Sequence, residues 1–195
     1  NSTISGNECD GFYIVDSSQV TISNSTISGN ECDGIALVNS SQVTISNSTI
    51  SGNGEEGMDL LDSSQATISN STISGNEGSG ILIEDSSCEV RISDSTISEN
   101  GADGITLCSQ GTITNSTISE NGHNGILLYD TARASLEGNK IFNNGRHGVK
   151  VSSWPTVFDG YVCGKGNTIY GNDRADVHPS ELRFLMSSDG GCYGP

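Results

Sequence analysis

The chain has 195 residues, of which 32% are hydrophobic and 5% aromatic, which excludes a large aromatic-rich core and favours a thin, regular one. Its net charge of −16 argues against nucleic acid and anionic membranes as partners, because an acidic surface repels both. No apolar run approaches the roughly 18 residues that cross a bilayer, so no membrane insertion is expected. All 8 basic residues lie at or after Arg91, so the first part of the chain is the most acidic.

A unit of about 23 residues, built around N-S-T-I-S-G-N, recurs from residue 1 almost to the end of the chain. Its copies align one isoleucine column: Ile4, Ile27, Ile50, Ile73, Ile97, Ile118, Ile141 and Ile169. An asparagine follows each isoleucine three residues later: Asn7, Asn30, Asn53, Asn76, Asn100, Asn121, Asn144 and Asn172. A single copy is too small to bury its own apolar face, so the copies are expected to stack as 7–8 coils around a shared core.

Each copy carries three short alternating segments, which predict three strands per coil. In the second copy, alternation points Ile35 and Leu37, then Val43 and Ile45, into the core. Glycines such as Gly34 precede the first of these pairs, where a turn needs a positive φ or a close backbone approach. The sequence therefore predicts an all-β solenoid.

Two columns of asparagine mark the corners of the coil. Asparagine tolerates the left-handed conformation, and stacked amides can hydrogen-bond along the coil axis, so the column from Asn7 to Asn172 is expected to form a ladder. A second bend falls at four further asparagines, each of which also opens an N-S-T glycosylation sequon: Asn24, Asn47, Asn70 and Asn115. The structural interpretation is favoured over glycans, because the repeat itself accounts for every copy.

Six cysteines suggest three disulfides. Cys9 and Cys32 occupy the same place in adjacent copies, where stacked strands bring their Cα atoms within bonding range. Cys88 and Cys108 lie near one full coil apart, and Cys163 and Cys192 remain as a clamp on the C-terminal region. The absence of C-x-x-C argues against zinc, and the even count indicates an extracellular or cell-surface protein, with free structural thiols as the alternative.

The solenoid is expected to cover residues 1–173, interrupted by a loop over residues 152–165. This segment carries Trp154, Phe158 and Tyr161 and is predicted to pack over a side or an end. Residues 174–195 leave the pattern, and Pro179 to Met186 are expected to form one or two helical turns with apolar Leu182, Leu185 and Met186. A terminal coil needs a cover, so this tail is predicted to be a C-terminal cap.

The paired patterns N-x-x-x-G-I-x-L and N-x-x-I-x-x-N resemble the right-handed parallel β-helix repeat over residues 1 to about 173. The family includes pectate lyases, other polysaccharide-active proteins, phage tailspikes, adhesins and surface proteins. The resemblance therefore implies a right-handed parallel β-helix and leaves the function open.

Carboxylates gather at one corner of the first copies. The resemblance to pectate lyases implies that carboxylates bind calcium around a basic residue, so Asp10, Asp33 and Glu56 are candidate ligands and calcium is the one cofactor suggested. The basic residues, however, lie elsewhere in the chain. The alternative is an ordinary solvated acidic surface.

One corner of later copies gathers His123, Arg146, His147 and Lys150. Histidine can act as an acid or base near neutral pH, and Arg or Lys can stabilise an anion, so His123, His147 and Lys150 are candidate catalytic residues. No G-x-S-x-G, H-E-x-x-H or P-loop motif accompanies them. Ordinary polar turn residues are the favoured alternative.

Three functions are compatible with these patterns. The leading prediction is a non-enzymatic extracellular structural protein, a solenoid subunit that stacks head to tail into a surface filament or sheath. The first copy carries no cap, so it is expected to bind another subunit, with side contacts through an apolar stripe on the G-I-x-L strands. The first alternative is a polysaccharide-binding or polysaccharide-degrading protein. The second is an ice-binding protein, which would use outward ranks such as Thr26/Ser28 and Thr49/Ser51.

Overall fold

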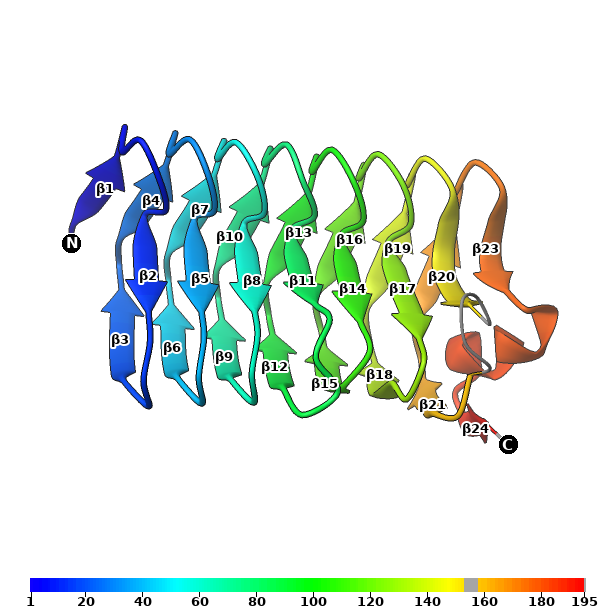
Figure 1. Ribbon diagram of the computed structural model, residues 1–195. Coiled ribbons are helices and arrows are strands. Elements are labelled where there is room, and N and C mark those ends of the chain that lie inside the picture. The colour runs from blue at the N-terminus through cyan, green and yellow to red at the C-terminus, as the bar shows by residue number, and fades with distance from the viewer. Residues whose placement is uncertain (153–157, 195) are drawn as a thin grey trace.

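The computed structural model describes residues 1–152 and 158–194 and confirms the predicted fold class, a parallel β-helix. Its strands form three sheets of eight strands each, which we call A, B and C. The coils stack in chain order from the blue N-terminal end to the red C-terminal end of Figure 1. Coil 1 comprises β1, β2 and β3, and each later coil adds one strand to each sheet.

The strands of each sheet follow one another at intervals of one coil. Sheet A contains β1 (Thr3–Ser5), β4 (Thr26–Ser28), β7 (Thr49–Ser51), β10 (Thr72–Ser74), β13 (Thr96–Ser98), β16 (Thr117–Ser119), β19 (Lys140–Phe142) and β22 (Thr168–Tyr170). Sheet B contains β2 (Phe12–Ile14), β5 (Ile35–Leu37), β8 (Met58–Leu60), β11 (Ile81–Ile83), β14 (Ile105–Leu107), β17 (Ile126–Tyr129), β20 (His147–Ser152) and β23 (Ala175–His178). Sheet C contains β3 (Gln19–Ser23), β6 (Gln42–Ser46), β9 (Gln65–Ser69), β12 (Glu89–Ser93), β15 (Gln110–Thr114), β18 (Arg133–Glu137), β21 (Tyr161–Lys165) and β24 (Gly191–Tyr193).

The isoleucine column forms one continuous stack along sheet A. Ile27 pairs in register with Ile4 on one side and with Ile50 on the other. Ile27 and Ile50 are fully buried, as are the inward residues Ile35 and Leu37 of sheet B. The predicted core therefore exists, and each coil completes the apolar contacts of its neighbours.

The asparagines from Asn7 to Asn172 form a hydrogen-bonded ladder at the corner between sheets A and B. In its buried middle, the Asn53 side-chain amide donates to Asn76 Oδ1 at 2.8 Å, and Asn76 donates in turn to Asn100 at 2.9 Å. The backbone N–H of Asn53 also donates to Asn76 Oδ1, at 3.1 Å. Polar groups that would otherwise be unpaired at a buried corner are thus satisfied from coil to coil.

The second bend, between sheets C and A, uses a different device. Asn24, Asn47, Asn70 and Asn115 adopt the expected left-handed conformation, with φ between 48° and 50°, and their side chains are exposed. The coil-to-coil bonds come from the next residue, a buried serine: Ser48 Oγ accepts from the Ser25 N–H at 3.1 Å and donates to Ser46 O at 2.8 Å. Use of the four sequons for glycans stays a prediction.

The glycines before sheet B are required by close packing. A Cβ at Gly34 would lie 2.6 Å from Gly57 O and 2.5 Å from Ile50 Cγ2. Positive φ values occur instead at Gly29 and its equivalents, at the end of each sheet A strand. Of the two reasons that the sequence suggested for the glycines before sheet B, close approach therefore applies.

The C-terminal region differs in extent from the expected loop and tail. Residues 161–165 form β21 of sheet C rather than a loop, and β23 continues sheet B to His178, beyond the expected boundary at residue 173. The 3₁₀ helix η1 (Ser180–Met186) follows, with Leu182 and Leu185 fully buried and Met186 exposed. Trp154 lies outside the described residues.

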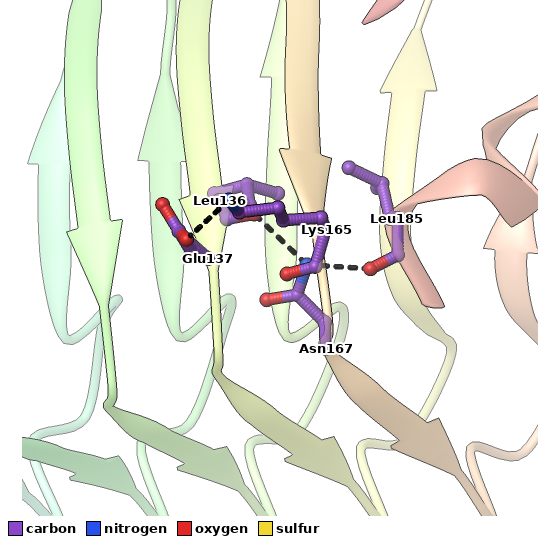
Figure 2. A network of polar contacts seen from close by, with 5 residues as sticks. All are labelled: Leu136, Glu137, Lys165, Asn167 and Leu185. Atoms are coloured by element: carbon purple, nitrogen blue, oxygen red, sulfur yellow. Dashed lines mark hydrogen bonds and ion pairs between the residues drawn. The ribbon is translucent and has the colours of Figure 1, made fainter. Parts of the chain in front are cut away.

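Helix η1 is tied to the last coils by polar as well as apolar contacts. The Asn167 side-chain amide donates to Leu185 O at 2.7 Å and to Leu136 O at 2.9 Å, as Figure 2 shows. Lys165 and Glu137 form an ion pair at 3.2 Å beside this network. A disulfide between Cys163 and Cys192 joins β21 to the antiparallel strand β24. The end of the solenoid is therefore covered by its own chain.

Candidate functional site

The outer face of sheet B carries an acidic and a basic side chain in one column. Its central outward column runs Tyr13, Ala36, Asp59, Leu82, Thr106, Leu127, Lys150 and His178. The apolar stripe expected on this face is interrupted by Asp59 and Lys150, as its sequence indicates, and also by His178. The face changes from acidic in the first coils to basic in the last ones.

A basic cluster lies at the edge of sheet B in coils 6 to 8. The backbone N–H of Arg146 donates to His123 O at 2.7 Å, and that of Arg174 donates to Arg146 O at 2.8 Å. The three residues therefore stack directly above one another in successive coils. His147 and Lys150 lie on β20, and Lys150 pairs in register with His178 on β23. The structure thus places the predicted His123 and Arg146 in one corner column, with His147 at the start of β20. Lys150 lies three residues further along that strand, in the central outward column.

His147 is the most perturbed member of this cluster. Its ring stacks on that of His178, with centroids 5.0 Å apart and an interplanar angle of 27°. Burial lowers the pKa of His147, and the charges of His178, Lys150 and Arg174 lower it further. Its Nδ1 atom is buried and has no hydrogen-bond partner among the described residues. A neutral imidazole of this kind can accept a proton at neutral pH.

Sequence reasoning missed Arg174 and His178, which belong to the degraded last coil. The signal was present: aligning Asn172 with Asn144 places Arg174 over Arg146 and His178 over Lys150. The prediction that the solenoid ended at residue 173 hid this alignment. The basic cluster is therefore larger than the sequence analysis indicated.

A second cluster, of carboxylates, lies at the same edge in coils 1 to 3. The Asp33 N–H donates to Asp10 Oδ1 at 3.1 Å, and the Glu56 N–H donates to Asp33 Oδ1 at 2.9 Å. Oxygens of Asp33, Glu55 and Glu56 lie within 4.8 Å of one another, so Glu55, which sequence reasoning missed, joins two of the predicted calcium ligands. Asp10 instead lies with Cys9 and Cys32.

Two carboxyl groups at this edge are difficult to ionise. Burial raises the pKa of Asp33 to about 7, against a hydrogen bond from the Glu56 backbone that lowers it. Burial likewise raises the pKa of Asp59 to about 6, with the charges of Glu56 and Glu84 adding to the effect. Asp59 Oδ1 is buried without a partner among the described residues. A bound cation would offset the repulsion between these neighbouring carboxylates and favour their ionised form.

The acidic and basic clusters do not form one site. Asp59 lies on coil 3 and Lys150 on coil 7, so four coil spacings of about 4.8 Å place them roughly 20 Å apart. The arrangement implied by the resemblance to pectate lyases, with a basic residue among the calcium ligands, is therefore not formed between these two clusters. They can still contact different parts of one long ligand.

Four of the six cysteines are free thiols in the structure: Cys9, Cys32, Cys88 and Cys108. The Sγ atoms of Cys9 and Cys32 are 3.7 Å apart, which is contact without a bond. Cys88 and Cys108 are buried, and burial raises the pKa of each thiol to about 11. Of the expected disulfides, the one present among the described residues is Cys163–Cys192.

The hydroxyl ranks expected for ice binding are regular on sheet A as far as coil 6. Thr26 pairs with Thr49, and Ser28 with Ser51, in register. In coils 7 and 8 the second position changes to Phe142 and Tyr170, whose rings stack 5.1 Å apart. Ice binding stays a prediction.

Comparison with known proteins places the chain among β-helices. A family model described as a right-handed beta helix region matches residues 1–112 and 106–193. No curated protein matches the sequence at a significant level. No helix among the described residues is long and apolar enough to span a membrane.

Several solved structures share the fold. The periplasmic alginate epimerase AlgG superposes with a TM-score of 0.77 at 18% identity, covering 87% of this chain and 45% of that one. The A-module of Azotobacter vinelandii mannuronan C-5 epimerase AlgE4 gives 0.67 at 20% identity, covering 80% and 48%. Pectate lyase Pel9A gives 0.67 at 16% identity, covering 86% and 55%. The chain spans less than half of the first two, and identities this low establish the fold alone.

Proposed function

Since the chain belongs to the right-handed β-helix family, we propose that it is a polysaccharide-active module that binds an acidic polysaccharide along the outer face of sheet B, outside the cell or in the periplasm. The solved structures with the same fold support this proposal, because alginate epimerases, a mannuronan epimerase and a pectate lyase are among them. They favour it over the predicted filament subunit. End-to-end stacking of copies stays a prediction.

The observation that carries the proposal is the basic cluster on an otherwise acidic molecule. The net charge is −16, yet Arg146, Lys150, Arg174 and two stacked histidines gather within coils 7 and 8. Like charges are costly to place side by side unless a ligand of opposite charge occupies the site. Carboxylates of a polyuronate are such a ligand, and arginine binds them through paired hydrogen bonds.

The acidic cluster has a role in the same proposal. An anionic polymer that crosses Asp33, Glu55 and Glu56 would be repelled, so we assign a bridging Ca²⁺ to these carboxylates. Calcium takes 6 to 8 oxygen ligands, and a protein carboxylate trio leaves positions for oxygens of the polymer. The residues therefore fit the ion, and no basic residue forms an ion pair with them in the part of the chain that the structure describes.

Proton abstraction from the bound sugar is a second candidate function, favoured by His147. The hydrogen on the ring carbon next to a uronate carboxylate is the most acidic C–H of the sugar. His147 would accept this proton, and Lys150 and His178 would stabilise the negative charge that moves onto the carboxylate. Return of a proton to the other face would epimerise the carbon, whereas loss of the neighbouring glycosidic oxygen would cleave the chain.

A binding experiment tests the proposal. The double variant Lys150→Met/Arg174→Gln should bind alginate or pectate oligosaccharides at least about tenfold more weakly than the unchanged protein in calorimetry. The matched control Lys140→Met/Arg183→Gln makes the same charge change on sheet A and η1, and should bind normally. Equal loss in both variants, or no binding by the unchanged protein with and without Ca²⁺, contradicts the proposal.

Catalysis has a separate readout. In D₂O, an active protein would exchange deuterium into the uronate ring carbon, which NMR detects whether or not the polymer is cleaved. His147→Gln should abolish exchange while binding persists. If the unchanged protein binds the oligosaccharide but shows no exchange, the protein is a binding module and the proposed proton abstraction is rejected.

A further inference from the structure

The corner between sheets B and C changes length in the middle of the solenoid. Residues 61–64 form this corner in coil 3, and coils 1 and 2 have corners of the same length. In coil 4 the corner is longer by one residue, at 84–88, and in coil 5 it shrinks to residues 108–109. A short corner between longer neighbours must be recessed. Changes of this kind within a regular repeat often mark a binding surface.

The recess is a hollow of about 420 Å³. Ser87 and Thr131 contribute from the corners of coils 4 and 6, and Ser109 from the short corner of coil 5. Ser86 and Cys88 add to the wall from the corner of coil 4. The opposite wall is formed by the first residues of successive strands in sheet C, which are paired in register: Gln65, Glu89, Gln110 and Arg133. This volume lies within the usual range for small-molecule sites.

The lining is polar and offers both donors and acceptors. Ser109 is 2% exposed, and its Oγ atom has no hydrogen-bond partner among the described residues. Arg133 is the one cation among the described lining residues, and its guanidinium lies 5.9 Å from the centroid of the Tyr161 ring. Glu89 is ion-paired with Arg91, which offsets its charge. An unpaired buried hydroxyl is costly, so rotation of the Ser109 side chain toward a ligand hydroxyl in the hollow would be stabilising.

We propose that this hollow binds one sugar ring bearing a carboxylate, as a subsite separate from the outer face of sheet B. Arg133 would hold the carboxylate, while Ser109 and the amides of Gln65 and Gln110 would hold ring hydroxyls. The class of ligand rests on the proposed function. The position of the site rests on the corner lengths and the lining residues alone.

Binding of small sugars tests the subsite directly. Glucuronate and glucose differ in one carboxylate, and binding of each is followed by ligand-observed NMR and calorimetry. The unchanged protein should prefer glucuronate, and Arg133→Gln should weaken glucuronate binding about tenfold or more while changing glucose binding little. Gln110→Ala should weaken both sugars.

The matched control is Gln42→Ala, which removes the same side chain from the same column outside the hollow. It should bind both sugars as the unchanged protein does. Melting curves for each variant separate lost binding from lost structure. If Arg133→Gln fails to fold, Gln110→Ala against Gln42→Ala still decides the question.

Failure of the subsite and failure of the proposed function are distinguishable. If Lys150→Met/Arg174→Gln abolishes binding of uronate oligosaccharides and Arg133→Gln leaves glucuronate binding unchanged, the subsite is rejected and the proposed function stands. No binding of either monosaccharide also rejects the subsite. If Arg133→Gln loses glucuronate binding, the subsite is supported, even where Lys150→Met/Arg174→Gln binds the polymer normally.

Discussion

The imidazole rings of His147 and His178 stack 5.0 Å apart across neighbouring coils, at the one edge of sheet B where basic residues accumulate. Two imidazoles in contact cannot both carry a proton without repulsion, and burial adds to this cost at His147. Protonation of His147 should therefore weaken the packing of coil 7 against coil 8.

The contribution of His147 to stability should fall below about pH 6.5. Because the folded state lowers the pKa of His147, the unfolded chain binds that proton more tightly, so stability is full above the unfolded pKa and is lost as pH falls through the folded one. His147→Gln should gain melting temperature relative to the unchanged protein as the pH falls from 7.5 to 5, as calorimetry of both proteins would show. The control is His123→Gln, which removes a histidine at the same edge whose ring stacks on no other ring among the described residues.

The carboxyl of Asp33 predicts the opposite trend. Its folded pKa of about 7 exceeds the ordinary value, so its contribution to stability is present at low pH and is lost as pH rises through 7. Asp33→Asn keeps the Oδ1 acceptor for the Glu56 N–H and should stabilise the protein at pH 8 by on the order of 1 kcal/mol, and much less at pH 5.

The measurement is the midpoint of urea unfolding at both pH values. Asp16→Asn removes an exposed carboxylate on another corner and is the control. Added Ca²⁺ should stabilise the unchanged protein at pH 8 more than it stabilises Asp33→Asn. A calcium response that is equal in both would contradict the assigned role of this carboxylate.

The repeat made the fold predictable, because a column of isoleucines can be buried only in a shared core and a column of asparagines can pair only along the axis of the stacked coils. Ile27 and Asn76 occupy the places that their alignment required. The candidate site was predictable only where the repeat was intact. His178 and Arg174 were missed because the last coil departs from the pattern, and Glu55 because its contact with Asp33 depends on side-chain direction across coils. The recess at Ser109 follows from a two-residue shortening. The sequence shows it as a spacing of 21 residues between Asn100 and Asn121, but this spacing does not say which corner of the coil is shorter.

Removal of an internal ladder residue should be strongly destabilising. Asn76→Ala would leave the buried N–H and side-chain amide of Asn53 without their acceptor, at a cost of about 3 kcal/mol. Asn70→Gly is the matched control, because glycine keeps the left-handed conformation at an exposed bend and should cost a few tenths of a kcal/mol. Chemical denaturation of both variants checks the difference. Similar losses in the two would mean that the ladder contributes little beyond backbone conformation.

Cys9 and Cys32 should form a disulfide when the protein is oxidised. Their Sγ atoms are already 3.7 Å apart in adjacent coils, so a small side-chain rotation would bring them within bonding distance. The bond would close a loop of about 23 residues and stabilise the first coils by roughly 3 kcal/mol.

Mass spectrometry of peptides from unreduced protein should show the cross-link, and Cys9→Ser should remove it and lower the melting temperature of oxidised protein only. The Cys88 and Cys108 thiols provide an internal comparison: they are buried, whereas Cys9 is exposed, so they should react more slowly with an added oxidant. Faster oxidation of Cys88 and Cys108 than of Cys9 and Cys32 would contradict the predicted order.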